Sequence, residues 1–238
     1  MPELQAGPIL SGERLALIEV EGRMPYASNT TLLARDRSDG LWVYKPERGE
    51  NPLWDFAWRT LAAREVLTYE VASAMGLDLV PETVLADGPF GPGSAQRFVA
   101  EDLEFDPRPL FIPRLDTRLW PVAVLDLVCN NADRKIGHVV RDKTADRLWA
   151  IDHGLTFHSE PKLRTVLWGF AGDTIPAPLV EALGGLRSRL ADGLADRVSA
   201  LLSEEEAGAL NDRVESLLSA PVHPHPPDDR PAVPWPLV

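Results

Sequence analysis

The densest group of reactive side chains follows an apolar run near the middle of the chain. The segment CNNADRKIGH holds Asn130, Asn131, Asp133, Arg134 and His138. Asp133, with Arg134 beside it, could orient or deprotonate an acceptor hydroxyl, and His138 could offer a neutral imidazole to a metal. Polar residues packed this densely beside a core element indicate a functional loop. The structural alternative is a helix C-terminal cap closed by an Asp–Arg ion pair.

A second carboxylate lies nineteen residues further on, where an apolar stretch ends in IDHG. Asp152 is expected at the end of a short strand, directly before His153 and Gly154. Carboxylate oxygens suit Mg²⁺ and Mn²⁺, and such an ion could bridge the phosphates of a nucleotide. IDHG alone is a weak signal, but a strand-end Asp that follows a loop Asp one hairpin earlier is a stronger one.

Two charged residues of the N-terminal half could complete such a site. Lys45 closes the stretch LWVYK and could bind nucleotide phosphates as a point charge. Glu65, in AREVLTY, could pair with Lys45 and fix its position. Taken alone, Lys45 would be a surface lysine at a strand end and Glu65 a helix-surface carboxylate. Together with the two aspartates they supply the parts that phosphoryl transfer needs: positioned phosphates, a metal held by carboxylates and a group that orients the acceptor.

The loop EGRMPYASN is the candidate phosphate cover. It lacks the patterns GxGxxG and GxxxxGK[ST], so neither a Rossmann site nor a P-loop is supported. Gly22, Ser28 and Asn29 could still cover phosphates with backbone amides and short side chains. A plain hairpin loop is an equally good interpretation.

The elements that must position these residues follow from hydrophobic periodicity and turn residues. In the N-terminal half we expect antiparallel strands within 15–20, 30–36 and 41–46, a loop over 22–29, a helix over 60–75 stopped by Gly76, and a second antiparallel pair within 79–88 and 93–102. In the C-terminal half we expect a buried helix over 119–131, short strands within 135–140 and 147–152, and amphipathic helices from Ile175 onward, the last over 204–218.

The chain ends in a proline-rich tail that is too rich in proline for a helix or a central strand. It should be extended or wrapped over the surface. His223 and His225 could bind a metal, although solvated tail is the more ordinary interpretation of such a pair.

Composition excludes several classes of function. A formal net charge of −12 disfavours nucleic acid and anionic membranes as partners. The single Cys129 excludes a disulfide framework. The N-terminus lacks a basic region followed by an apolar stretch, and no run approaches a membrane-spanning length, so a cytoplasmic location is the default expectation.

Four segments together carry a resemblance to a known group. VYKP around Lys45, AREVLTYEVASAMGLDLVPETV around Glu65, NNADRKIGH around Asp133 and AIDHG around Asp152 resemble the atypical kinases related to phosphatidylinositol 3- and 4-kinases and HipA-type kinases. More closely, they look like an uncharacterised actinobacterial family similar to that group. The resemblance covers roughly residues 12–200.

The resemblance implies a two-lobed, protein-kinase-like α+β fold. A small antiparallel β-rich N-lobe with one helix (8–105) and a mainly helical C-lobe (106–218) would hold ATP or GTP between them, followed by the tail (219–238). Segment 95–105 would be the hinge that contacts the base.

The resemblance also implies roles for single residues. Lys45 would bind phosphates, Glu65 would orient Lys45, Asp133 would be the catalytic aspartate and Asp152 the chief metal ligand. Relatives usually carry an Asn where this chain has His138, which would favour Mn²⁺ or another transition metal over Mg²⁺.

The function expected from the sequence is an ATP- or GTP-dependent phosphotransferase acting on a small molecule or a protein. A nucleotide-binding pseudokinase with a regulatory or scaffolding role is the main alternative, and nucleotidyl transfer on the same fold is another. A metalloprotein built on His138, Asp152 and His153 is disfavoured, because no HExxH or comparable ligand spacing occurs. Trp54, Phe56, Trp58 and Trp168 could line an acceptor pocket or fill the core.

Overall fold

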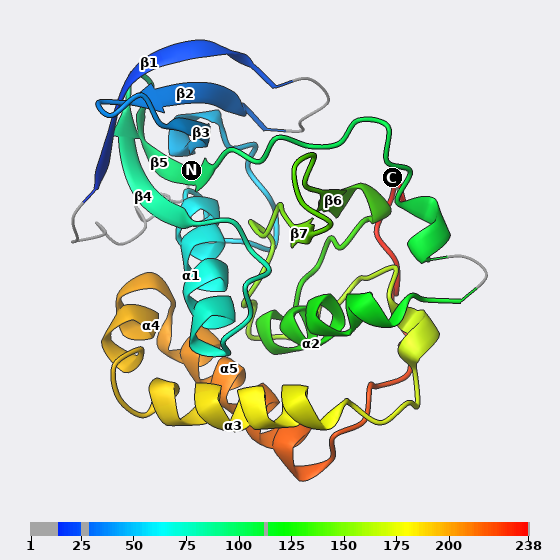
Figure 1. The fold of residues 1–238 in the computed structure, drawn as a ribbon. Helices are drawn as coiled ribbons and strands as arrows, with labels where there is room; N and C mark the ends of the chain where they lie inside the picture. Colours follow the sequence, from blue (N-terminus) through cyan, green and yellow to red (C-terminus); the bar gives the residue numbers. More distant parts are fainter. Residues whose placement is uncertain (1–13, 25–28, 112–113, 238) are drawn as a thin grey trace.

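The computed structural model describes residues 14–24, 29–111 and 114–237. Figure 1 shows that the first strands curl around one another beside a single helix, while the later part of the chain is mainly helical. The N-terminal elements are β1 (Leu15–Arg23), β2 (Leu32–Asp36), β3 (Leu41–Pro46), α1 (Leu61–Ala74), β4 (Thr83–Gly88) and β5 (Gly91–Arg97). The expectation of a β-rich N-terminal region with one helix is therefore confirmed.

The five strands close into a barrel in the order β1-β2-β3-β5-β4. The prediction of a purely antiparallel sheet is wrong at one point, because Leu15 and Ala16 of β1 pair in parallel with β4. Two irregularities in the register of β1 against β2 allow the strand to bend. Arg14 holds its start by donating a hydrogen bond to the carbonyl of Ala86 (3.1 Å).

Alternation along β3 decides which of its residues face away from the barrel core. Trp42 and Tyr44 are buried in that core, at 2% and 0% exposure. Successive side chains of a strand point to opposite faces, so Val43 and Lys45 project from the other side. This side borders the pocket described below.

Helix α1 lies beneath the barrel and buries nine of its fourteen residues. The predicted stop is confirmed, because Gly76 follows the helix with a positive φ of 68°, a conformation that glycine adopts without strain. A buried charge on such a helix needs a partner. Arg64 and Glu65 are 2% and 3% exposed, and they form ion pairs with Glu206 and Lys45.

The C-terminal part is built around a buried helix, as predicted. Its elements are α2 (Trp120–Cys129), β6 (Val139–Arg141), β7 (Leu148–Ala150), α3 (Ala177–Leu190), α4 (Ala195–Leu201) and α5 (Glu204–Ser219). Nine of the ten residues of α2 are buried, and α5 packs against both α2 and α3. The predicted strand over 135–140 is shorter than expected, because Ile136–His138 forms a 3-10 turn before β6.

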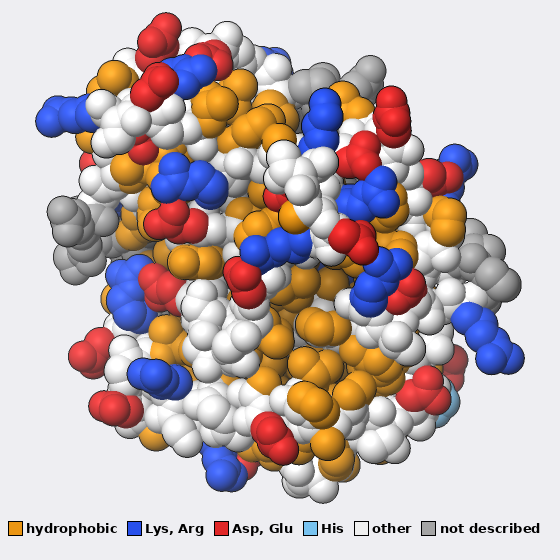
Figure 2. All heavy atoms as spheres, in the orientation of Figure 1, with side chains coloured by type: hydrophobic (Ala, Val, Ile, Leu, Met, Phe, Trp, Pro, Cys, Tyr) orange, Lys and Arg blue, Asp and Glu red, His pale blue; other side chains and the backbone are white. Residues whose placement is uncertain are grey.

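Apolar side chains also reach the surface over α2 and α3, where Figure 2 shows them gathered on one face among charged side chains of both signs. Among the described residues, no helix is both long enough and apolar enough to cross a membrane.

The tail does follow the surface, but the prediction of solvated histidines is wrong for His223. This side chain is 1% exposed and its ring contacts those of Trp120, Trp168 and Phe170. Its Nδ1 lies 2.9 Å from the carbonyl oxygen of Pro224. Burial among aromatic rings makes His223 an anchor of the tail.

Closure of the barrel depends on the absence of a side chain at Gly93. A Cβ atom there would lie 2.2 Å from the carbonyl oxygen of Lys45 in the paired strand. We expect Gly93→Ala to lower the free energy of unfolding by about 1–3 kcal/mol through overpacking, measured by urea unfolding. Gly22→Ala is the control, because a Cβ atom at Gly22 meets nothing within 4 Å. Equal stability of both variants would contradict this account of the barrel.

Candidate active site

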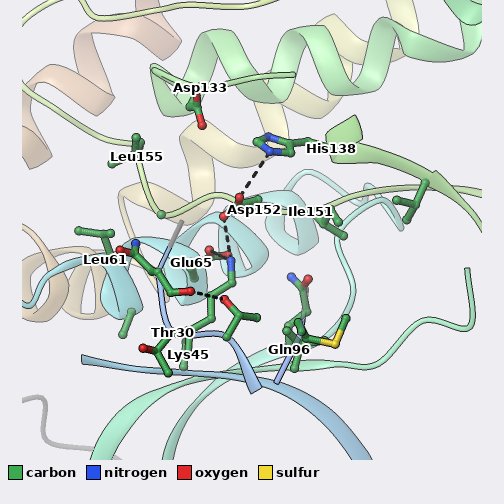
Figure 3. Close-up of a pocket in the computed structure, with 18 of the residues that line it drawn as sticks. Thr30, Lys45, Leu61, Glu65, Gln96, Asp133, His138, Ile151, Asp152 and Leu155 are labelled. Carbon is green, nitrogen blue, oxygen red and sulfur yellow. Dashed lines mark hydrogen bonds and ion pairs between the residues drawn. The ribbon is translucent and has the colours of Figure 1, made fainter. Parts of the chain in front are cut away.

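A pocket of about 820 Å³ lies between the barrel with α1 and the segments that follow α2. Its lining includes Lys45, Glu65, Asp133, His138 and Asp152, which are all the acidic, basic and imidazole residues that the sequence analysis assigned to the reaction except Arg134. In Figure 3, Lys45 and Glu65 lie on the side of the barrel and α1, and Asp133, His138 and Asp152 face them. Residues far apart in sequence thus meet at one cavity of ligand-binding size.

Lys45 is the centre of the charge arrangement. Its ammonium group forms an ion pair with Glu65 Oε1 and another with Asp152 Oδ1 at 2.8 Å (Figure 3). Burial alone would lower the pKa of Lys45, but the charges of Asp152 and Glu65 hold it above its ordinary value. Lys45 is therefore a permanent cation. It is linked to Glu65 of α1 and to Asp152 in the segment that follows β7.

Glu65 is the more deeply buried partner, with its side chain 4% exposed. Burial raises the pKa of Glu65, while the ammonium of Lys45 opposes this shift. A buried carboxylate that loses its cation is strongly destabilised. The side chain of Glu65 consequently has one suitable position, in contact with Lys45.

Asp152 is held in an uncommon backbone conformation, with a φ of 60°. Non-glycine residues rarely adopt this region, and those that do cluster at functional sites. The charge of Lys45 holds the pKa of Asp152 far below its ordinary value, against the opposing effect of burial. Asp152 is thus an anion that points into the pocket over the physiological pH range.

His138 lies on the other side of Asp152, with Nε2 3.4 Å from Asp152 Oδ2. Burial lowers the pKa of His138 to about 4, although the charge of Asp152 acts in the opposite direction. A neutral imidazole can donate an electron pair to a metal ion. Its Nδ1 is buried without a hydrogen-bond partner in the described part of the chain.

Asp152 and His138 could hold a divalent metal ion if a bound ligand and water supplied its remaining coordinating atoms. Among the described residues, no group of three or more His, Cys, Asp or Glu side chains could hold a metal ion alone. Asp152 and His138 supply a carboxylate and an imidazole. Mg²⁺ at phosphate sites is commonly bound by one or two carboxylates together with phosphate oxygens and water.

Asp133 stands across the pocket from Lys45, in a loop that leaves α2. Its backbone N–H donates to the side chain of Asn131 (3.0 Å), and its carboxylate pairs with Lys135 at 3.1 Å. Partial burial raises the pKa of Asp133 above its ordinary value, while Lys135 opposes the shift. A carboxylate with a raised pKa is a stronger base and therefore suits proton abstraction.

Arg134 is not beside Asp133 in the pocket, contrary to the expectation from sequence. It is 0% exposed, and it forms two hydrogen bonds to Asp126 of α2, at 2.8 and 2.9 Å. Arg134 also donates to the carbonyl oxygens of His138 and Ile151. The structural alternative of a helix C-terminal cap with an Asp–Arg ion pair is present, with Asn130 as the cap of α2 and Asp126 as the partner of Arg134.

The three residues proposed as a phosphate cover have different positions. Ser28 lies outside the described residues. Gly22 is exposed within β1, which runs three residues beyond its predicted end at 20, and it pairs with Leu33. Asn29 lines the pocket and accepts a hydrogen bond from the backbone N–H of Asn51 (2.9 Å).

Two residues of the pocket lining, Lys135 and Trp235 of the tail, were not expected from the sequence. Gln96 also lines the pocket, and it belongs to segment 95–105, which was expected to contact the base. Lys135 had a detectable signal, since it lies two positions after Asp133 in the same polar segment. Trp235 had none beyond being an aromatic residue in a proline-rich stretch, because only the folded chain brings its position to the pocket.

A curated protein matches almost the whole chain. The chain is 39% identical over 257 aligned residues to Protein Rv2133c of Mycobacterium tuberculosis (strain ATCC 25618 / H37Rv), covering 92% of this chain and 91% of that protein. No protein-family model matches the sequence.

Solved kinase structures share the fold at low sequence identity. A Helicobacter pylori proinflammatory kinase, CtkA, superposes with a TM-score of 0.55 at 13% identity, covering 87% of this chain and 93% of that chain. The Golgi casein kinase gives a TM-score of 0.53 at 12% identity, covering 88% and 73%. Its form with Mn and ADP bound gives 0.52 at 13% identity, with the same coverage. The fold is therefore kinase-like.

The pocket wall contains a carboxyl group whose ionisation opposes folding. Burial raises the pKa of Glu50 to about 7 from an ordinary value of 4.5, although backbone N–H groups at the start of α1 favour its charged form. The folded state therefore binds this proton more tightly than the unfolded state does. The resulting stabilisation is complete below pH 4.5 and is lost as the pH rises towards 7.

We expect Glu50→Gln, which keeps the neutral form, to be more stable than the wild type at pH 8 and to lose this advantage as the pH falls to 4.5. Urea unfolding across this range measures the difference. Glu181→Gln, at an exposed position of α3, is the control and should change the free energy of unfolding by less than about 0.5 kcal/mol. A gain in the free energy of unfolding of Glu50→Gln that does not vary with pH would contradict the raised pKa of Glu50.

Proposed function

This chain belongs to the family of Protein Rv2133c of Mycobacterium tuberculosis, and we propose that it is an ATP- or GTP-dependent phosphotransferase of the atypical kinase type. It acts on a small molecule or a protein, uses Mg²⁺ or Mn²⁺, and is related to phosphatidylinositol 3- and 4-kinases and HipA-type kinases. The kinase-like fold supports the class of reaction, and the charged pocket supports activity.

One observation carries the proposal. Lys45 forms ion pairs with a buried glutamate of α1 and with an aspartate from the opposite side of the pocket. An ammonium group held between two carboxylates in a cavity of this size is placed to exchange one of them for a phosphate. Phosphoryl transfer depends on such positioning and on charge stabilisation more than on covalent chemistry.

Each residue then has a defined task. Lys45 binds the nucleotide phosphates, and Glu65 keeps Lys45 in place. Asp133 accepts the proton of the acceptor hydroxyl while the hydroxyl oxygen forms a bond to the γ-phosphorus and the bond between the γ-phosphorus and the nucleoside diphosphate leaving group breaks. Asp152 and His138 would hold the divalent ion, which when bound neutralises charge on the phosphates.

Arg134 acts as a positioning residue in this proposal. Its guanidinium group joins Asp126 of α2 to the carbonyl oxygens on either side of β6 and β7, so it fixes the loop of Asp133 relative to Asp152. Gly22, Ser28 and Asn29 are proposed to lie along the phosphates, with Asn29 supported by its place in the pocket lining.

The proposed domain arrangement follows the same division. Residues 8–105 form the nucleotide-binding N-lobe and 106–218 the catalytic C-lobe, with 95–105 as the hinge and 219–238 as the tail. The pocket supports this arrangement because residues of both parts line it. The solved neighbour with Mn and ADP bound supports a nucleotide and a divalent ion as cofactors.

A nucleotide-binding pseudokinase is the second candidate, favoured by one observation. The resemblance to atypical kinases implies an oxygen ligand at the position that His138 occupies, and the described residues hold no group of three metal-binding side chains. Nucleotide binding without turnover in the wild type would favour this candidate.

Removal of the two aspartates should separate binding from turnover. We expect Asp152→Ala to weaken metal-dependent ATP or GTP binding by about 10- to 100-fold, as for the loss of a contact to a charged group. Asp133→Ala should leave binding largely intact and reduce turnover by about 10²- to 10⁴-fold. Isothermal titration calorimetry with Mn²⁺·nucleotide measures binding, and the rate of ADP or GDP release measures turnover.

Asp146→Ala, at an exposed position of the β6–β7 turn, is the matched control and should affect neither quantity. Equal nucleotide affinity of the wild type and Asp152→Ala would count against the assigned metal ligand. Full turnover by Asp133→Ala would remove the role given to that carboxylate.

The role of Lys45 predicts selective loss of phosphate recognition. We expect Lys45→Ala to weaken binding of the nucleoside triphosphate by about 10- to 100-fold and to weaken binding of adenosine or guanosine much less. Titration of each ligand into the same protein sample gives the comparison. A loss of equal size for nucleoside and triphosphate would contradict phosphate binding by Lys45.

A further inference from the structure

The C-terminal tail, residues 220–237, returns along the helical part of the chain towards the pocket. It starts with backbone hydrogen bonds from Ile175 to the carbonyl of Pro221 and from Gly172 to that of His223, each 2.9 Å. The buried ring of His223 fixes this part of the tail. Figure 1 shows the last stretch, in red, rising from the end of α5 to the region of β6.

The far end of the tail is held at two points. The carbonyl oxygen of Ala232 accepts hydrogen bonds from the backbone N–H of Thr165 (3.0 Å) and from the indole of Trp168 (2.7 Å). The carbonyl oxygen of Leu237 accepts one from Ile136 (2.9 Å). Ile136 lies three residues after Asp133, so the tail is attached directly to the loop that bears the proposed base.

Trp235 lies between these two attachments. The preceding Pro234 is buried, yet the side chain of Trp235 is 88% exposed and lines the pocket. A large aromatic group on a fixed backbone loses little further freedom when a ligand packs on it. The fold thus holds an uncovered indole at the edge of the proposed reaction site.

Two further residues of the pocket lining are also apolar and exposed. Leu103 is 88% exposed and Leu53 is 37% exposed, and both also line the pocket. The three residues come from three separate segments of the chain, and Leu103 belongs to segment 95–105, which is proposed to contact the base of the nucleotide. Exposed apolar groups that border one cavity indicate a ligand with apolar surface.

The attachments of the tail indicate whether Trp235 faces the nucleotide or the acceptor. Within the described part of the chain, the backbone hydrogen bonds that join the tail to segments before α5 go to residues 136, 165 and 172–175, which belong to the helical part and to the loop of Asp133. Lys45, which is proposed to bind the phosphates, and Glu65, which holds Lys45 in place, belong to β3 and α1. Trp235 is therefore on the acceptor side of the site.

We propose that the tail completes the acceptor side of the site, with Trp235 as an aromatic wall against which an apolar part of the acceptor packs while its hydroxyl group faces Asp133. The proposal rests on the phosphotransferase function. It narrows the acceptor to alcohols that carry an aromatic or aliphatic group near the hydroxyl.

Two probe alcohols test the proposal in the full chain. Ethanol and 2-phenylethanol carry the same primary hydroxyl and differ in one aromatic ring. In saturation-transfer NMR with Mg²⁺·ADP present, we expect transfer to the ring protons of 2-phenylethanol and none to ethanol. Trp235→Ala should reduce the ring signal about 5- to 10-fold, and Trp235→Phe should restore most of it.

Trp54→Ala is the matched control. Trp54 is as exposed as Trp235, at 91%, but it is not part of the pocket lining, so its removal should leave the ring signal unchanged. No ring signal in the wild type, an equal signal in Trp235→Ala, or an equal loss in Trp54→Ala would overturn the acceptor wall.

Nucleotide affinity separates this proposal from the one it rests on. We expect Trp235→Ala to bind Mg²⁺·ADP as the wild type does. Weaker ADP binding in this variant would assign the indole to the nucleotide and overturn the acceptor role. Failure of the wild type to bind any nucleotide would instead withdraw the phosphotransferase function itself.

Discussion

The ammonium group of Lys45 is the point on which the arrangement of the pocket depends. A charge at the edge of a buried region needs compensation, and here two carboxylates provide it, one from α1 and one from the strand end after β7. Three elements must therefore meet at one position. This requirement explains why α1 carries a buried Glu65 and why the chain accepts a left-handed conformation at Asp152.

Arg134 has a comparable function on the other side of the pocket. It is fully buried and forms hydrogen bonds with Asp126, with His153 and with two backbone carbonyls. The loop of Asp133 and the segment of Asp152 are thus held by one guanidinium group, whose planar shape suits several simultaneous hydrogen bonds. The two aspartates share a rigid support although nineteen residues separate them.

Local sequence patterns predicted much of this fold. The alternation along β3, the stop at Gly76 and the apolar run of α2 each depend on neighbouring residues, and each is present. Closure of the barrel, the partner of Arg134 and the return of the tail to Trp235 depend on contacts between distant segments. Periodicity has no information about such contacts. The sequence therefore placed a buried arginine in the pocket, and it gave no sign that a tryptophan of the surface tail lines the pocket.

The most direct test of the account is a thermal-shift titration of the wild-type protein with ATP, GTP and ADP, each with Mg²⁺, Mn²⁺ or EDTA. A ligand that binds only the native state raises its melting temperature, by about 5–10 °C for a chain of this size at a hundredfold excess over the dissociation constant. The account predicts a rise that needs both a nucleotide and a divalent ion. An unchanged melting temperature under every condition would contradict the nucleotide site.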